Sequence, residues 1–409
     1  MARATRIAAV FAAAAAAVIA WRAETFWTGD YPVEAGPAID ALIHGRLHDF
    51  FASRPLMGPL SLILRAPFAA LSLITGGGGA RDFYENAYRF GVFPCVVAAG
   101  VFGIFLARAA LRRGVPRHIA WGAFALVVVN PVSLKAVTYG HPEEILCAAL
   151  LAGAMLAALE GRDGWAALLA IAALLTKQWA FLGLLPVAFA MNPQRLRKYA
   201  LITAGVMVAA AVPLLIANAS SFIELNRHLL DTTTADVTPA SAWWLFLPAS
   251  PGGDGALHTT PTWLGNLGHP LLIVVCLAVA VALAPRVRRD PFGRAFALLA
   301  LVMLLRAMLD PVNNSYYHVP FFVALVAADA LGRRYLPTLI AVAGFILVID
   351  LQRWPTLQAA FYLAWAVGFT AYLVTRSCGV DLGELVRSPG ARGQAAAQSA
   401  HSSSSAARS

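Results

Sequence analysis

Apolar segments of about twenty residues recur along almost the whole chain, separated by short polar stretches. A bilayer-spanning helix needs about 20 apolar residues, and the ten-residue alternation of transmembrane strands is absent. The pattern therefore predicts an all-α polytopic membrane protein with about 11–13 transmembrane helices. The spans are expected near 6–22, 88–110, 118–137, 145–160, 164–178, 180–192, 199–217, 269–285, 294–309, 319–332, 336–350 and 357–375.

The polar stretches between these spans fall into two sets that alternate along the chain. One set is basic and contains Arg3, Arg6, Arg112, Arg113, Arg117, Arg162, Arg195, Arg197, Lys198, Arg286, Arg288, Arg289, Arg294, Arg333, Arg334 and Arg376. The other is acidic and contains Asp30, Glu34, Asp40, Glu143, Glu144, Glu224, Asp231, Asp236, Asp310 and Asp350. Cytoplasmic loops carry an excess of Lys and Arg. The basic set and both termini are therefore expected in the cytoplasm, and the acidic set outside a plasma membrane.

The segment LMGPLSLILRAPFAALSLIT (56–75) is also long enough to span. Counting it as a span would reverse every later loop and place Arg65 in mid-membrane, at a cost of roughly 2.5 kcal/mol or more. We therefore expect an interfacial or re-entrant helix on the outer face. A single helix over 164–192 would likewise bury Lys177 near its centre, so we expect two short spans that turn near Lys177-Gln178-Trp179.

These assignments predict a single transmembrane domain over 1–376. Its large outer loops cover about 23–87 and 218–268, and the first carries interfacial helices around a flexible GGGG at 76–79. The tail, 377–409, is rich in Ala, Ser, Gly and Arg and is predicted to be disordered in the cytoplasm. The N-terminus resembles a signal peptide, but an uncleaved first span fits better in front of so many others.

Composition excludes several classes of protein. The chain is 59% hydrophobic and 13% charged, with a mean hydropathy of +0.68. A soluble domain could not cover that much apolar surface with polar residues. The net charge of +10 does not indicate nucleic-acid binding, because the basic residues lie in short loops between apolar segments. The four cysteines are scattered without metal-ligand spacing, so neither a disulfide framework nor a zinc site is expected.

The stretch TYGHPEEILCA (138–148) places His141, Glu143 and Glu144 in a tight turn between two spans. Turns need polar residues, and this explains a single carboxylate such as Glu144. A solubilising turn rarely needs a histidine and two acids together, which indicates a site. A histidine and a glutamate could together bind a divalent ion, but this one loop supplies too few ligands. We therefore expect no cofactor, with a divalent metal ion as the less favoured alternative.

Other polar residues converge on the same predicted outer face. Asp30 and Glu34 follow the first span directly, and charged residues at span ends are costly unless they face a cavity. For Lys135 and Arg306, snorkelling to the interface is an equal alternative. The candidate substrate-binding residues are His141, Glu143, Glu144, Lys135, Lys177, Gln178, Arg306, Asp310, Asn313, Asn314, Tyr316, Tyr317 and His318.

Acids and bases gathered where a membrane meets the outside suit the transfer of a group carried on a lipid. With a polyprenyl-phosphate sugar as donor, a carboxylate takes the proton from the acceptor hydroxyl. Cationic groups stabilise the leaving phosphate, which needs no general acid because it leaves as an anion. Direct attack by the acceptor inverts the anomeric centre.

Three stretches carry a resemblance to a known family: GDYPVEAGPAIDALIHGRLHDF with the following RPLMGPLSLILRAPFAAL, the region from NPVSLKAVTYGHPEEILCA to LLTKQWAFLGLLP, and LDPVNNSYYHVPFFVAL. The chain resembles the GT-C superfamily of polytopic glycosyltransferases. Its closest likeness is to glycosyltransferase family 87, the polyprenol-phosphate-mannose-dependent α-mannosyltransferases.

The resemblance implies a GT-C-like fold and transfer of a hexose, expected to be mannose, to a lipid or glycan acceptor on the outer face. It implies a catalytic aspartate just beyond the first span, a position that Asp30 matches best and Glu34 second best. This chain has His141, Glu143 and Glu144 where the family usually carries Gln and Asn.

Two other classes of function stay open. A dozen spans with embedded charges also allow a secondary transporter or flippase for a lipid-linked or small polar substrate, although no symmetric pair of broken helices is visible. A non-catalytic assembly partner is the third alternative.

Overall fold

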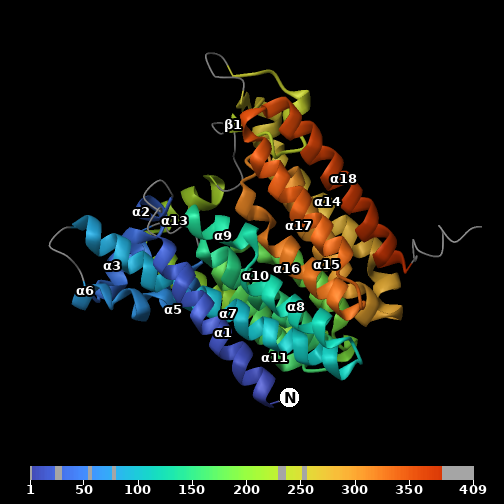
Figure 1. Cartoon of the computed structure of the whole chain (residues 1–409). Coiled ribbons are helices and arrows are strands. Elements are labelled where there is room, and N and C mark those ends of the chain that lie inside the picture. Colours follow the sequence, from blue (N-terminus) through green and yellow to red (C-terminus); the bar gives the residue numbers. More distant parts are fainter. Residues whose placement is uncertain are drawn as a thin grey trace, which may run out of the picture.

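The computed structural model describes residues 2–23, 30–53, 58–75, 80–228, 236–250 and 256–379, and it is almost entirely helical (Figure 1). Among these residues, nine helices are long and apolar enough to cross a membrane. They correspond to nine of the predicted spans, so the all-α, multi-pass architecture is confirmed. The predicted GGGG segment at 76–79 and the tail from 380 onward lie outside the described residues.

The helices and strands follow one another along the chain as α1 (Ala2–Arg22), α2 (Tyr31–Glu34), α3 (Gly36–Ile43), α4 (Leu47–Ala52), α5 (Pro59–Ala69), α6 (Ser72–Thr75), α7 (Ala80–Arg112), α8 (Arg117–Val128), α9 (Pro131–Thr138), α10 (Pro142–Leu159), α11 (Asp163–Thr176), η2 (Gln178–Ala180), α12 (Phe181–Ala190), α13 (Pro193–His228), β1 (Asp236–Val237), η3 (Trp244–Phe246), β2 (His258–Thr259), α14 (Thr262–Arg289), α15 (Pro291–Leu309), η4 (Ser315–His318), α16 (Val319–Leu331), α17 (Leu336–Asp350), η5 (Leu351–Arg353) and α18 (Pro355–Cys378).

The remaining three predicted spans form shorter apolar helices, as does the segment predicted to be interfacial or re-entrant. These four helices cover Asp163–Thr176, Gln178–Ala190, Ser315–Leu331 and Pro59–Thr75. In the last of them, α5 packs against α3, α7 and α11. Arg65 on α5 is fully buried, so this cation lies inside the protein.

The predicted break at Lys177 is present. Lys177 has an extended backbone (φ −148°, ψ 134°) between α11 and the short η2 turn that leads into α12. Asp163, at the start of α11, pairs with Arg195, beyond the end of α12, at 3.7 Å. Because the two ends of the pair of helices meet, the chain reverses at Lys177 as expected.

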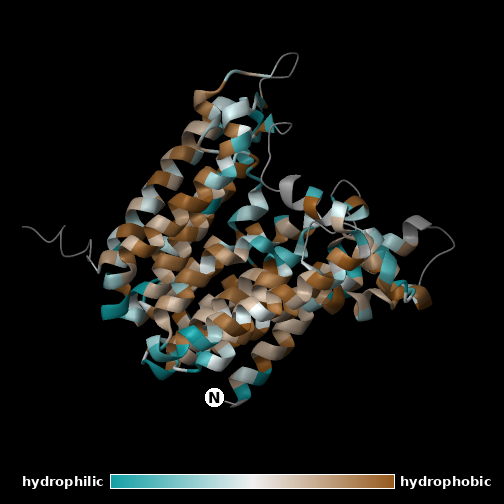
Figure 2. Cartoon of the chain, turned by 180° about the vertical axis from the view of Figure 1, so that it is seen from behind, coloured by the Kyte–Doolittle hydropathy of each residue, from teal (hydrophilic) through white to brown (hydrophobic). Residues whose placement is uncertain are grey.

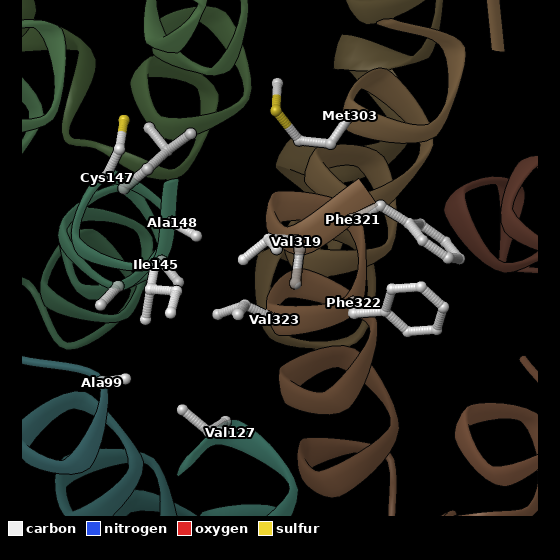
Figure 3. Close-up of a cluster of buried hydrophobic side chains, with 14 of the residues drawn as sticks. Ala99, Val127, Ile145, Cys147, Ala148, Met303, Val319, Phe321, Phe322 and Val323 are labelled. Carbon is white, nitrogen blue, oxygen red and sulfur yellow. The ribbon is translucent and has the colours of Figure 1, made fainter. Parts of the chain in front are cut away.

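Helix α10 lies at the centre of the molecule and packs against α7, α11 and α16. Its residues Ile145 and Ala148 face Val319 and Val323 of α16 across a tightly filled core (Figure 3). Alanine is frequent along α10, and small side chains let helices approach closely in membranes. The HPEE stretch (141–144) therefore lies at the beginning of a helix whose residues are mostly buried.

Polar residues divide between the two ends of the long helices. Hydrophobic residues dominate the helix lengths, and hydrophilic residues gather mainly at helix ends and connections (Figure 2). At one end Arg112 pairs with Glu160, and Arg333 donates to the carbonyl oxygen of Arg113. We call this the arginine-rich end. The other end carries the HPEE turn, because Glu160 follows the last turn of α10 and His141 precedes its first.

The second large loop covers the turn after α15. Its strands β1 and β2 pair in antiparallel fashion, while residues 229–235 and 251–255 lie outside the described part of the chain. Ser241 donates a hydrogen bond to the carbonyl oxygen of Asp310 at 3.0 Å, and Trp243 donates to that of Leu309 at 2.8 Å. These contacts fix the turn that carries Asp310.

Candidate active site

A tight backbone turn places His141. Helix α9 ends at Thr138, and Gly140 then adopts φ +89°, a left-handed conformation that glycine tolerates best. Pro142 occupies the first position of α10, where its fixed φ suits a helix start. The amide of His141 donates to the carbonyl oxygen of Ala136 at 2.8 Å, so the imidazole is directed inward and is buried.

His141 joins two carboxylates. Its Nε2 lies 3.0 Å from Oδ2 of Asp30, and its Nδ1 lies 2.9 Å from Oε1 of Glu143. The Tyr316 ring stacks on the imidazole with 4.3 Å between centroids. The backbone amide of Asp30 donates to the carbonyl oxygen of Tyr139 at 3.3 Å, which holds the start of the segment after α1 that the structure describes against this turn.

The two carboxylates keep His141 protonated. Burial by itself lowers the pKa of His141, but the hydrogen bonds to Asp30 and Glu143 outweigh it and raise the pKa to about 9. At neutral pH the side chain is therefore an imidazolium that donates from both nitrogens. Asp30 is then oriented through one oxygen, and its side chain is still 52% exposed.

Glu143 is the buried anchor of this cluster. It has no solvent exposure, and three cations surround it: His141 at 2.9 Å, Lys177 at 3.2 Å and Arg65 at 3.4 Å. A buried charge is tolerated only with such partners. Glu143 thereby joins α5, α10 and the break after α11, and it positions His141 rather than facing solvent.

Glu144 points toward a different partner. Its Oε1 accepts a hydrogen bond from Nε1 of Trp179 at 3.2 Å and lies 3.6 Å from Nζ of Lys177. Its Oε2 is buried and has no hydrogen-bond partner within the described part of the chain. Glu144 also lines a cavity, so its carboxylate is a candidate acceptor for a ligand hydroxyl.

The cavity beside this cluster has a volume of about 390 Å³. Its walls combine carboxylates, cations, aromatic rings and an apolar side formed by α12 and α14. The lining residues are Glu34, His141, Glu144, Lys177, Gln178, Trp179, Phe181, Leu182, His269, Leu272, Ile273, Arg306, Asp310, Tyr316 and Tyr317.

Arg306 contributes a buried positive charge to this cavity. Its Nη1 donates to the carbonyl oxygen of Tyr317 at 3.0 Å. The guanidinium carbon lies 4.2 Å from the ring centre of Tyr317 and 5.1 Å from that of Trp179. Among the described residues Arg306 has no ion pair with a carboxylate. A buried guanidinium without a counter-charge is suited to bind an anion.

Asp30, Glu34 and His141 also form the group that could hold a metal ion. Each offers one ligand atom, and these atoms lie within 4.8 Å of one another. The HPEE turn alone supplies too few ligands, and the two acids Asp30 and Glu34 complete this group. Burial raises the pKa of Glu34, with His141 acting in the opposite direction. The geometry therefore allows a divalent cation here without requiring one.

Several predicted site residues lie outside the cavity lining. Lys135 is half-buried on α9, with Nζ 6.0 Å from the Tyr139 ring centre. The Nε2 of His318 lies 3.1 Å from the Tyr362 hydroxyl oxygen. Asn313 donates to that same hydroxyl at 2.9 Å, and Asn314 donates to the Tyr316 hydroxyl at 3.3 Å. Asn314 therefore supports Tyr316 in the cavity wall, and the donor-binding role of Lys135 and His318 stays a prediction.

Three residues that were not predicted from the sequence belong to the site. Arg65 binds Glu143, Trp179 donates to Glu144, and His269 lies 3.3 Å from Oδ1 of Asp310. Two of them left a signal in the sequence. Arg65 is a lone charge in an apolar segment, and His269 is a lone titratable residue at the start of one.

Comparison with known proteins agrees with this geometry. The family model described as glycosyltransferase family 87 matches residues 56–309, more than half of the chain. The match includes α5, the HPEE turn, the Lys177 break and Arg306. A search of curated proteins gives no match. The chain therefore belongs to glycosyltransferase family 87 and is a multi-pass membrane glycosyltransferase.

Proposed function

We propose that this enzyme transfers a hexose, most simply mannose, from a polyprenyl-phosphate sugar to a lipid or glycan acceptor on the outer face of the cytoplasmic membrane. The observation that carries the proposal is Arg306, a buried guanidinium without a carboxylate partner among the described residues, which faces the cavity beside Asp30 and His141. A glycosyltransferase needs an anion site next to a base. Arg306 lines the cavity, and Asp30 lies behind its wall, 3.0 Å from the lining residue His141.

The donor phosphate is assigned to the cationic part of the cavity. Arg306 supplies the charge, with Lys177 and His269 beside the same space. Charge-assisted hydrogen bonds from these groups would stabilise the phosphate as the glycosidic bond breaks. Phe181, Leu182, Leu272 and Ile273 form an apolar side of the cavity, where the isoprenoid chain would leave toward the membrane.

Asp30 is assigned the role of general base. His141 holds Oδ2 of Asp30, which leaves the second oxygen for the acceptor hydroxyl. The acceptor oxygen attacks the anomeric carbon as Asp30 takes its proton. The bond between the anomeric carbon and the phosphate oxygen breaks, and the polyprenyl phosphate leaves as an anion. One direct displacement inverts the anomeric configuration. Glu144, which lines the same cavity, would accept a hydrogen bond from a sugar hydroxyl.

We infer the membrane orientation from the distribution of charge. The arginine-rich end lies at the opposite end of α10 from His141, and Lys and Arg accumulate on the cytoplasmic side. The cavity would then open to the outer face, which lacks nucleotide sugars and requires a lipid-linked donor.

The experiment is transfer of labelled mannose from polyprenyl-phosphate mannose by the purified protein in lipid. Arg306→Gln removes one charge-assisted contact, so donor affinity should fall about 10- to 100-fold. Arg289→Gln, an exposed change at the arginine-rich end, should leave donor affinity unchanged. Donor binding that is equal in wild type and Arg306→Gln would contradict the proposal.

A further inference from the structure

A second cavity lies far from the site, in a groove whose floor is α10 and whose walls are α7 and α11. Its volume is about 540 Å³, and apolar side chains dominate its lining. Phe105 on α7 and Trp165 on α11 border it and are 50% and 61% exposed. Gly153 and Ala157 on α10 contribute small side chains to the floor, which deepens the groove.

The groove ends in a basic recess. A third cavity is lined by Arg112, Arg113, Leu159, Glu160, Arg162 and Phe292, and it shares Glu160 and Arg162 with the apolar groove. Glu160 pairs with Arg112 and lies 3.7 Å from Nε of Arg162. The guanidinium of Arg113 rests 3.7 Å from the ring centre of Phe292. Three arginines against one glutamate leave an excess of positive charge.

The length of the groove matches the thickness of the hydrocarbon layer of one leaflet. Its lining on α10 runs from Ala149 to Glu160, which corresponds to about 16 Å at 1.5 Å per residue. Half of the hydrocarbon core of a bilayer is about 15 Å thick. One acyl chain of a lipid in the nearer leaflet can therefore lie along the groove with its headgroup in the recess.

We propose that this groove and recess form a binding site for an anionic glycerophospholipid of the leaflet on the arginine-rich side. The apolar walls would hold one acyl chain, and Arg112, Arg113 and Arg162 would hold the phosphate and the anionic headgroup. Charge decides between lipids here, because a zwitterionic headgroup gains little from an excess of arginine. The site lies at the opposite end of α10 from the cavity assigned to the sugar donor.

The test is native mass spectrometry of the full-length protein, equilibrated with phosphatidylglycerol and phosphatidylcholine of identical acyl chains. Wild type should retain phosphatidylglycerol in preference. Arg112→Gln with Arg162→Gln should reduce the ratio of bound phosphatidylglycerol to phosphatidylcholine about tenfold. Arg286→Gln with Arg289→Gln removes equal charge from exposed positions at the same end and should preserve the ratio.

Two glycine variants, one in the groove and one outside it, test whether an acyl chain occupies the groove. A Cβ at Gly153 meets Leu169 at 3.4 Å, whereas one at Gly205 meets nothing within 4 Å. Gly153→Leu should therefore lose both bound lipids, and Gly205→Leu should keep them. If the double arginine variant does not fold, Arg162→Gln alone serves, because its side chain is 60% exposed.

Three outcomes would overturn the proposal. They are equal retention of the two lipids by wild type, an unchanged ratio in the arginine variant, and a lipid-free dimer that Gly153→Leu dissociates. The last would assign the groove to a second copy of the chain.

Discussion

Replacing Arg65 with methionine tests the idea that buried ion pairs hold the site together. Arg65 lies 3.4 Å from Glu143, and neither side chain has solvent exposure. The guanidinium also lies near the rings of Tyr31 and Tyr88, at 5.4 Å and 6.0 Å. Methionine fills similar space but cannot neutralise the carboxylate.

The expected cost follows from what remains around Glu143. Removing one partner of a buried ion pair costs about 3–5 kcal/mol, mostly because the other charge is left uncompensated. Glu143 retains Lys177 at 3.2 Å and His141 at 2.9 Å. We therefore expect the lower end of that range, a loss of about 3 kcal/mol in the free energy of unfolding.

The assay is equilibrium unfolding in mixed micelles, with Arg46→Met as the control. Arg46 pairs with Asp40, but its side chain is 50% exposed, so its loss should cost less than about 1 kcal/mol. A double-mutant cycle with Glu143→Gln should show a coupling of about 1–3 kcal/mol. Equal effects of Arg65→Met and Arg46→Met, or strictly additive effects in the cycle, would refute the reasoning.

Three further predictions concern pH, metal and orientation. Since the pKa of His141 is about 9 in the folded protein and about 6.5 unfolded, its stabilisation is complete below pH ~6.5 and lost as pH rises through 9. Melting temperatures between pH 6 and 10 should therefore fall more for wild type than for His141→Gln, and parallel curves would contradict this. A chelator should leave the transfer rate unchanged, because Lys177 and Arg306 already supply positive charge to the cavity; activity lost with chelation and restored by Mg²⁺ or Mn²⁺ would instead indicate a bound cation. In a Cys378→Ser background, an impermeant thiol reagent should label Thr138→Cys and spare Arg289→Cys on intact cells, and the reverse pattern would invert the orientation.

The length of the apolar segments predicted the spanning helices well, because the membrane imposes a minimum length on each span. The break at Lys177 was also predictable, since a lysine at the centre of a long helix would be costly. Sequence placed the acidic first loop, the HPEE turn and Lys177 at the same depth, and the structure brings Asp30, His141, Glu143 and Lys177 into contact.

The depth of a residue in the membrane does not determine which face of a helix it occupies. This explains why the observed site differs from the predicted one at several residues. Arg65 was treated as a reason against a span, but it is the buried partner of Glu143. Lys135 and His318 lie near the correct depth, yet neither lines the cavity. His269 joins the lining from α14. Its position as a lone titratable residue marks it in the sequence, but the local pattern does not show which site it contacts.

The central claim is that Asp30 accepts the proton of the acceptor in sugar transfer, and one comparison tests it most directly. Transfer from polyprenyl-phosphate mannose is measured for wild type, Asp30→Asn and Glu34→Gln, with donor binding and melting temperature determined on the same samples. The account predicts that Asp30→Asn loses at least about 10²-fold in rate while folding and donor binding persist, and that Glu34→Gln retains most activity. Full transfer by folded Asp30→Asn would contradict it, as would a collapse of the rate in Glu34→Gln alone.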